Sequence, residues 1–217
     1  MNDLAPLWLS ARVTGAALVL VVIPGLAAAL LMTFRRFPGK ALFETLLTLP
    51  LVLPPTVVGY GLLLTLGRGT TFGRWLNESA HVQFLFTETG ITIAAAVMGL
   101  PLFIRPVSAA FSAIEPDLLE AARIDGARRS ALLFRILLPL STRGLLAGTL
   151  LAGARALGEF GATLMVGGAL PGRTETLPIV LYNAVQAGQD HQALVAALWL
   201  TGTALVLVWL VNRMGRV

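Results

Sequence analysis

The sequence predicts an all-α integral membrane protein that crosses the bilayer about five times. Of its 217 residues, 56% are hydrophobic and only 12% are charged, and the mean hydropathy is +0.81. Soluble domains carry about 25% charged residues, so this chain has more apolar surface than one soluble core would hide. Long stretches without a charge also recur, and a helix of about 20 apolar residues crosses the hydrocarbon layer of a membrane.

Three stretches carry no charged residue at all. They cover residues 13–34, 45–67 and 192–212, which are 22, 23 and 21 residues long. Because an apolar run of about 18 or more residues predicts a transmembrane helix, we interpret each stretch as one membrane span.

Two further apolar stretches contain isolated charges. Residues 89–111 are apolar except for Arg105, and residues 144–166 are apolar except for Arg155 and Glu159. With these two the chain has five predicted spans in a single transmembrane domain, residues 1–217. An odd number of crossings places the two termini on opposite sides of the membrane.

The basic residues are distributed unevenly about these spans. Fifteen of the sixteen are arginines, and the side with fewer of them holds Arg12, Arg68, Arg74 and Arg173. Ten lie on the other side if there are five spans: Arg35, Arg36, Lys40, Arg123, Arg128, Arg129, Arg135, Arg143, Arg213 and Arg216. Cytoplasmic loops carry the excess of basic residues, so the N-terminus is expected outside and the C-terminus in the cytoplasm.

The second span contains residues that interrupt helices. Proline lacks a backbone donor and clashes with the preceding turn, so a helix that carries Leu53-Pro54-Pro55-Thr56 is expected to kink or break. The carbonyls that this frees need partners in protein or water. Pro54, Pro55 and Thr56 are therefore candidates for a bent, pathway-lining helix, and the alternative is a structural kink between packed helices.

The fourth span combines small residues with a pair of opposite charges. Gly144 and Gly148 form a small-xxx-small pattern that permits close helix packing. Arg155 and Glu159 are four residues apart, on one face of a helix, and charges at membrane depth usually face a cavity or each other. The pair is either an internal salt bridge that locks the helix or a polar gate in the pathway wall, and both roles are compatible.

The segment after the fourth span contains one further helix signal. Pro178 suits the start of a short helix that ends near Gly188. The alternative is an ordered loop without a helix.

Residues 112–140, between the third and fourth spans, are too patterned for a disordered cytoplasmic loop. Pro116 suits the first turn of a helix, where its missing N–H is no loss. Asp117 and Glu120 favour the same end of the helix dipole. A short helix is therefore expected to begin near Pro116.

A turn and a second helix are predicted to follow. Asp125-Gly126 is a turn signal, and the second helix is expected from about Ala127 to Leu138, where Pro139 stops it. The first helix presents small residues beside Glu120, and such a face can enter a cleft on another protein. The alternative is an amphipathic segment that lies on lipid headgroups, and composition alone does not decide between them.

The loop resembles the EAA loop of ABC importer permeases. Glu120-Ala121-Ala122, then Gly126, then Leu138-Pro139 follow that family's pattern in order and spacing. In the family this loop forms a coupling helix, which docks in a groove of the cytoplasmic ATPase. The resemblance implies ATPase-coupling roles for Glu120, Ala121, Ala122, Asp125, Gly126, Arg128 and Pro139.

Three further stretches are similar to the molybdate permeases within this family: Thr48–Leu64, Ala154–Gly168 and Pro171–Tyr182. The sulfate permeases share part of the second stretch, so sulfate or another oxyanion stays open as the substrate. Tungstate, which has nearly the same size and charge as molybdate, is expected to follow the same route.

The resemblance also implies an architecture and partners. The expected fold is that of a type I ABC importer permease in a bacterial inner membrane. The pathway would lie on the two-fold axis of a homodimer, because five helices are few for enclosing a pore. The implied partners are a cytoplasmic ABC ATPase dimer, an extracytoplasmic oxyanion-binding protein, a second copy of the chain and membrane lipid, but no nucleic acid.

The sequence lacks motifs for energy conversion and catalysis. It has no GxxxxGK[ST] loop, no HExxH motif and no cysteine, so we expect no enzyme activity and no cofactor, with ATP and Mg²⁺ bound by the partner ATPase. A secondary transporter or channel is the competing class. Such proteins often show inverted repeats with discontinuous helices, whereas this sequence shows one proline-broken span and no clear repeat. A membrane enzyme is disfavoured because there is no catalytic cluster.

Overall fold

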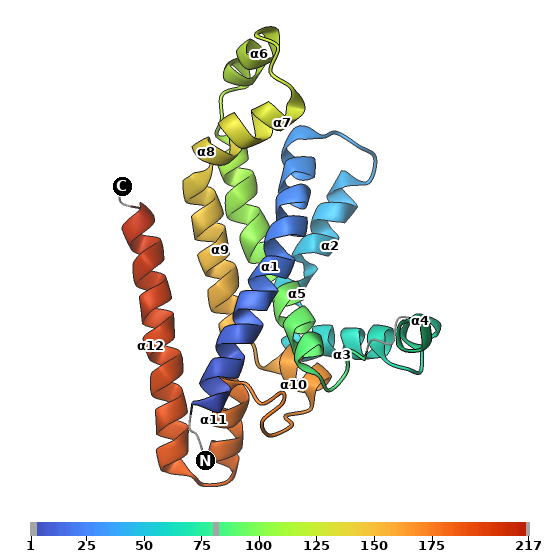
Figure 1. The fold of residues 1–217 in the computed structure, drawn as a ribbon, viewed down its shortest axis with the longest axis vertical. Helices are drawn as coiled ribbons and strands as arrows, with labels where there is room; N and C mark the ends of the chain where they lie inside the picture. The colour runs from blue at the N-terminus through green and yellow to red at the C-terminus, as the bar shows by residue number, and fades with distance from the viewer. Residues whose placement is uncertain (1–3, 80–82, 216–217) are drawn as a thin grey trace.

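The computed structural model describes residues 4–79 and 83–215, and the regular structure of these residues is helical (Figure 1). In chain order the elements are α1 (Ala5–Phe34), α2 (Lys40–Val52), α3 (Pro55–Leu66), α4 (Thr71–Ser79), α5 (Glu88–Ser112), α6 (Pro116–Ile124), α7 (Arg129–Leu132), the π-helix η1 (Leu133–Leu137), α8 (Leu138–Leu140), α9 (Thr142–Leu157), α10 (Gly161–Gly167), α11 (Leu177–Gln186) and α12 (Asp190–Gly215).

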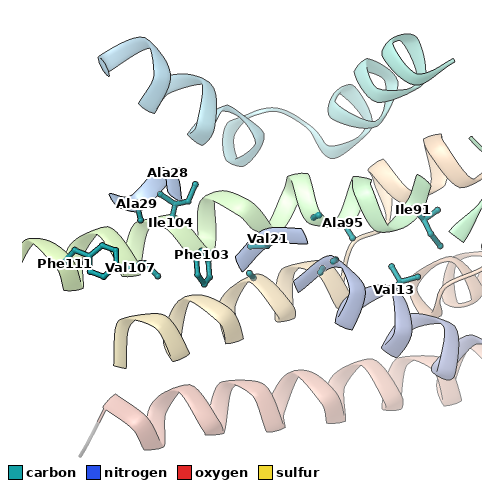
Figure 2. Packing of buried hydrophobic residues seen from close by; sticks show 14 of the residues in the cluster. Val13, Val21, Ala28, Ala29, Ile91, Ala95, Phe103, Ile104, Val107 and Phe111 are labelled. Carbon is teal, nitrogen blue, oxygen red and sulfur yellow. The ribbon is translucent and has the colours of Figure 1, made fainter. Parts of the chain in front are cut away.

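Helix α5 is the centre of the bundle and packs between α1 and α9. Its side chains Phe103, Val107 and Phe111 are fully buried. Figure 2 shows them beside Val21 and Ala28 of α1, in the apolar cluster that joins the two helices. Helix α12 lies at the outside of the bundle, against α9 and α11.

Glycines allow the neighbouring helices to approach α5 closely. A Cβ atom placed on Gly148 of α9 would lie 2.8 Å from the backbone oxygen of Phe103, and one on Gly25 of α1 would lie 3.0 Å from Cε1 of the same residue. A Cβ on Gly144 would likewise meet Ala110 of α5. The close packing expected from the small residues of the fourth span is therefore confirmed.

Three of the predicted spans fall within long helices. Residues 13–34, 89–111 and 192–212 lie inside α1, α5 and α12, which are 30, 25 and 26 residues long. Each helix is longer than its apolar range, because Arg12, Glu88 and Arg213 lie just outside the ranges but within the helices. These three helices are long and apolar enough to cross a membrane, and bent helix pairs raise the number of candidate spans to five.

The second predicted span is broken at its prolines. Helix α2 ends at Val52, α3 begins at Pro55, and the two axes are bent by 116°. The 13 residues of α2 cover only about 20 Å, so residues 45–67 do not form one straight crossing. The predicted kink or break is confirmed.

The fourth predicted span was wrong as a continuous helix. Residues 144–166 comprise most of α9 and α10, with Gly158, Glu159 and Phe160 outside either helix. No proline causes this break. The Glu159 carboxylate accepts a hydrogen bond from the backbone N–H of Ala162 at 2.7 Å, so this side chain satisfies a free donor at the start of α10.

Two short helices, α4 and α11, lie outside the predicted spans. The helix expected at Pro178 is confirmed, because α11 runs from Leu177 to Gln186 with this proline in its first turn. Helix α4 was not predicted, since its polar sequence gives no apolar run. The N-terminal end of α1 and the C-terminal end of α12 point toward opposite ends of the bundle, with α12 ending beside the start of α9 (Figure 1). Arg216 lies outside the described residues.

Candidate functional site

The first candidate site is the helical segment between α5 and α9, at one end of the molecule (Figure 1). Helix α6 begins at Pro116 and carries Asp117 in its first turn, so the start predicted from these residues is confirmed. Its basic residue Arg123 lies in the last turn, where a positive charge favours the negative end of the helix dipole.

Gly126 ends α6 in the left-handed backbone conformation, with φ +84°. The Gly126 N–H donates to the carbonyl of Arg123, and the Ala127 N–H donates to that of Ala122, each at 3.0 Å. This pair of bonds is a Schellman motif, which satisfies two terminal carbonyls and requires a residue that tolerates positive φ. The predicted turn is confirmed, and Gly126 has a structural reason for being glycine.

The second half of the segment differs from the expectation. The helix does not stop at Pro139 but continues to Leu140, and its turn over Leu133–Leu137 is a π-helix in which the Leu138 N–H donates to the carbonyl of Leu133. Proline lacks an N–H and its ring crowds the carbonyl four residues earlier, and the wider π turn accommodates it. Beyond Ser141 the axis turns by 72° into α9.

Much of this segment is exposed. On α6 the side chain of Leu119 is buried, whereas that of Ile124 is 86% exposed. The residues assigned to ATPase coupling lie at this surface: Glu120, Ala121, Asp125, Gly126, Arg128 and Pro139 are exposed, and Ala122 is half-buried. Asp125, Gly126 and Arg128 line one pocket at this surface, whereas Pro139 lies on α8, and the coupling role of all these residues stays a prediction.

The second candidate site lies where the two broken helices meet. A Cβ on Gly161, the first residue of α10, would lie 3.0 Å from Cβ of Pro55 and 3.2 Å from the backbone nitrogen of Thr56, at the start of α3. Farther along, a Cβ on Gly59 would lie 2.7 Å from Cα of Ala162. The N-terminal ends of α3 and α10 are thus in contact.

Pro54 precedes this contact as the N-cap of α3, and its carbonyl accepts hydrogen bonds from the N–H groups of Val57 and Val58. Thr56 is exposed. The prolines of the second span and the start of α10 therefore form one cluster, which we call the break cluster: Pro54, Pro55, Thr56, Arg155, Glu159 and Gly161.

A charge pair belongs to the break cluster. Arg155 Nη1 lies 2.6 Å from Glu159 Oε2, with the Arg155 side chain 26% exposed and that of Glu159 fully buried. Glu159 Oε2 has no hydrogen-bond partner, because the angles of this contact do not meet the geometry of a hydrogen bond. The two side chains therefore interact mainly through the attraction of opposite charges. The expected internal salt bridge is present, and the second Glu159 oxygen caps α10. A role as a gate stays a prediction.

Sequence reasoning gave too little weight to Arg105 and Gly161. Arg105 is exposed on α5, the most buried of the long helices, and no carboxylate of the described residues lies within ion-pair distance of it. From the sequence, Arg105 was noted only as the one charged residue within the apolar range 89–111. The two glycines that bracket Glu159-Phe160 were the available signal for the second break.

Comparison with known proteins identifies the family. Residues 7–216 match the family model described as "Binding-protein-dependent transport system inner membrane component". The chain belongs to this family. The segment between α5 and α9, residues 113–141, is called the coupling segment below after its predicted role. This segment and the break cluster are accordingly parts of a membrane permease component that has no ATPase site of its own.

Individual relatives are similar over most of the chain. The molybdenum transport system permease protein ModB of Escherichia coli (strain K12) is 43% identical over 82% of this chain and 78% of its own length. The putative molybdenum transport system permease protein YvgM of Bacillus subtilis is 41% identical, over 87% of this chain and 83% of its own. The sulfate transport system permease protein CysW of a Synechocystis strain is 38% identical over 84% of this chain and 66% of its own.

The fold also matches a solved structure. A chain in the crystal structure of a bacterial ABC transporter involved in the import of the polysaccharide alginate superposes with a TM-score of 0.78. The match covers 100% of this chain and 80% of that chain at 19% sequence identity. The expected type I ABC importer permease fold is confirmed.

Proposed function

We propose that this chain is the permease subunit of an ATP-driven importer of molybdate, and that it also transports tungstate. The observation that carries this is the 43% identity to a molybdenum permease over 82% of the chain. A second relative named for molybdenum transport, at 41% identity, supports the same substrate.

The energy for transport is supplied by a separate cytoplasmic ATPase dimer, which binds ATP and Mg²⁺. The exposed surface of α6 supports this, because a single buried side chain, Leu119, anchors a helix whose other apolar residues, such as Ile124, face outward. A helix that packs against its own chain on one face and is exposed on the opposite face can insert into a cleft of a partner. Closure of the ATPase dimer would then move α6 and, through the bend at Ser141, helix α9.

The pathway lies on the two-fold axis of a homodimer and passes the break cluster. The starts of α3 and α10 meet there, and helix N-termini carry partial positive charge that favours anions. Arg155 adds a full positive charge, which Glu159 offsets at 2.6 Å. A nearly neutral site of this kind holds an oxyanion weakly and releases it, so selectivity resides mainly in an extracytoplasmic binding protein.

The distribution of basic residues at the helix ends supports the proposed orientation. The coupling segment, the Arg35-Arg36 end of α1 and the C-terminal end of α12 lie toward one end of the molecule (Figure 1). Since cytoplasmic segments carry the excess of basic residues, that end faces the cytoplasm and the N-terminus faces outward in the bacterial inner membrane.

Sulfate is the second candidate substrate. The CysW relative, named for sulfate transport, is 38% identical over 84% of this chain, only a few per cent below the molybdenum permeases. Molybdate, tungstate and sulfate are doubly charged tetrahedral oxyanions, so the same pathway accommodates each of them.

The test is reconstitution of the full complex, namely the chain with its ATPase and its binding protein in lipid vesicles. We expect molybdate and tungstate to stimulate ATP hydrolysis and to accumulate inside, and sulfate to do so more weakly. Stronger stimulation by sulfate would assign the chain to sulfate import. Uptake that continues without the ATPase would overturn the importer mechanism altogether.

A further inference from the structure

A groove lined by both apolar and basic residues lies beside α6. It has a volume of about 700 Å³ and is bounded by the end of α1, by α6 and by the α7–η1 segment. Its inner wall is apolar, formed by leucines such as Leu119, Leu132 and Leu137, which are each 8% exposed. The groove therefore offers a surface that water does not solvate well.

Three arginines line the same groove: Arg35 at the end of α1, Arg123 on α6 and Arg129 on α7. All three are exposed. No acidic residue lines the groove, and no carboxylate of the described residues lies within 4.0 Å of these guanidinium groups. Three positive charges thus line one groove beside an apolar wall, and the described residues supply no counter-ion to them.

We propose that an anionic phospholipid of the cytoplasmic leaflet occupies this groove. Its phosphodiester would pair with the three arginines, and an acyl chain would lie along the leucines. A free oxyanion would satisfy the charges but leave the apolar wall uncovered, and a zwitterionic lipid would cover the wall but bring its own cation. Basic pockets between helix ends on the cytoplasmic side are suited to anionic lipid headgroups. This inference rests on the proposed orientation.

The position of the groove gives the lipid a role in coupling. Arg35 belongs to α1, whereas Arg123 belongs to α6, which this chain fixes mainly through Leu119. A phosphate bound to both arginines would brace the coupling helix against α1. ATPase activity of the complex should therefore respond to the anionic lipid content of the membrane.

The lipid site is tested by titrating the delipidated full-length chain with phosphatidylglycerol or phosphatidylcholine of matched acyl chains, with native mass spectrometry as the readout. The wild type is expected to prefer phosphatidylglycerol. The double variant R35Q/R129Q is expected to bind it about thirtyfold more weakly, since each arginine near a lipid phosphate contributes roughly fivefold. Binding of phosphatidylcholine should stay unchanged.

The matched control is R36Q/R135Q, which removes the same charge from two exposed arginines that do not line the groove. It should keep the preference for phosphatidylglycerol. An equal loss in the control would mean that bulk charge attracts the lipid, and displacement of phosphatidylglycerol by inorganic phosphate would mean a free-anion site. Either result overturns the proposal.

Association with the ATPase separates this inference from the proposed function. If R35Q/R129Q but not the control loses the ATPase in lipid-free detergent, the arginines contact the ATPase and the lipid site is wrong. If the wild type brings down no ATPase at all, the proposed importer function fails. The lipid titration then still shows whether phosphatidylglycerol binds in the groove.

Discussion

At the scale of single residues, Gly126 is required for its backbone and not for space within this chain. Its φ is +84°, and apart from its chain neighbours no heavy atom of the described residues lies within 4 Å of a Cβ added there. Gly126→Ala is therefore expected to cost about 1 kcal/mol in the left-handed conformation, and to weaken ATPase binding by about fivefold. Titration of the reconstituted permease with ATPase measures this.

Gly126→Asn is the matched control, because asparagine tolerates the left-handed conformation better than alanine does. It should bind the ATPase more tightly than the alanine variant. If asparagine binds more weakly than alanine, the ATPase approaches this position too closely for a larger side chain, and the backbone explanation is wrong.

Glu159 has two functions that a conservative variant separates. One oxygen accepts the N–H of Ala162 and the other lies beside Arg155. Glu159→Gln keeps an acceptor for the N–H but leaves the Arg155 charge without compensation. Because removing one partner of a buried pair is costly and Arg155 is partly exposed, we expect a loss of about 1–3 kcal/mol, measured as a lower Tm in detergent.

The double variant Arg155→Gln/Glu159→Gln tests whether the two residues act together. It removes both charges, so it should recover most of the stability lost in Glu159→Gln. Additive losses in the double-mutant cycle would show that the 2.6 Å contact contributes nothing to stability.

At the scale of the elements, the contact of α9 with α5 depends on Gly148. A Cβ at this position would lie 2.8 Å from the Phe103 carbonyl oxygen, and backbone atoms cannot move aside as a flexible side chain can. Gly148→Val is expected to cost about 2 kcal/mol or more by overpacking, and to lower the Tm by several degrees.

Gly202→Val on α12 provides the comparison, since among the described residues no atom outside the neighbouring helix backbone lies within 4 Å of a Cβ there. Its Tm should match that of the wild type. Equal shifts in the two variants would mean that valine acts through helix propensity alone, and that the α5–α9 contact tolerates a side chain at Gly148.

The elements that sequence reasoning predicted well depend on local signals. Uncharged runs locate α1 and α12, an apolar run interrupted only by Arg105 locates α5, and Pro116 and Gly126 set the two ends of α6. Each signal acts within a few residues of itself, through hydropathy, a missing donor or a permitted positive φ. A short stretch of sequence is therefore enough to predict these helices and their ends.

The elements that were missed depend on contacts between distant residues. The break between α9 and α10 places Gly161 against Pro55 and Thr56, more than one hundred positions earlier, and a hydropathy window cannot register that contact. The π turn before Pro139 is a local adjustment, but proline alone does not tell whether a helix stops or widens. Five residues of the break cluster were predicted as candidates, namely Pro54, Pro55, Thr56, Arg155 and Glu159, but neither Gly161 nor the contact between α3 and α10 was predicted.

At the scale of the whole molecule, the chain is polarised along the length of the bundle. The coupling segment and the basic end of α1 lie at one end, and α11 with the start of α12 lies at the other (Figure 1). The orientation proposed for the membrane rests on this asymmetry, because charge bias sets topology.

The absence of cysteine from the sequence makes this orientation directly measurable. Single cysteines at Ser130, in the coupling segment, and at Gln189, between α11 and α12, would each be exposed. In intact cells a membrane-impermeant maleimide is expected to label Gln189→Cys and to leave Ser130→Cys unlabelled, and opening the cells should make both react. The reverse pattern would place the coupling segment outside, where no ATPase can reach it, and the proposed importer mechanism would fall with the orientation.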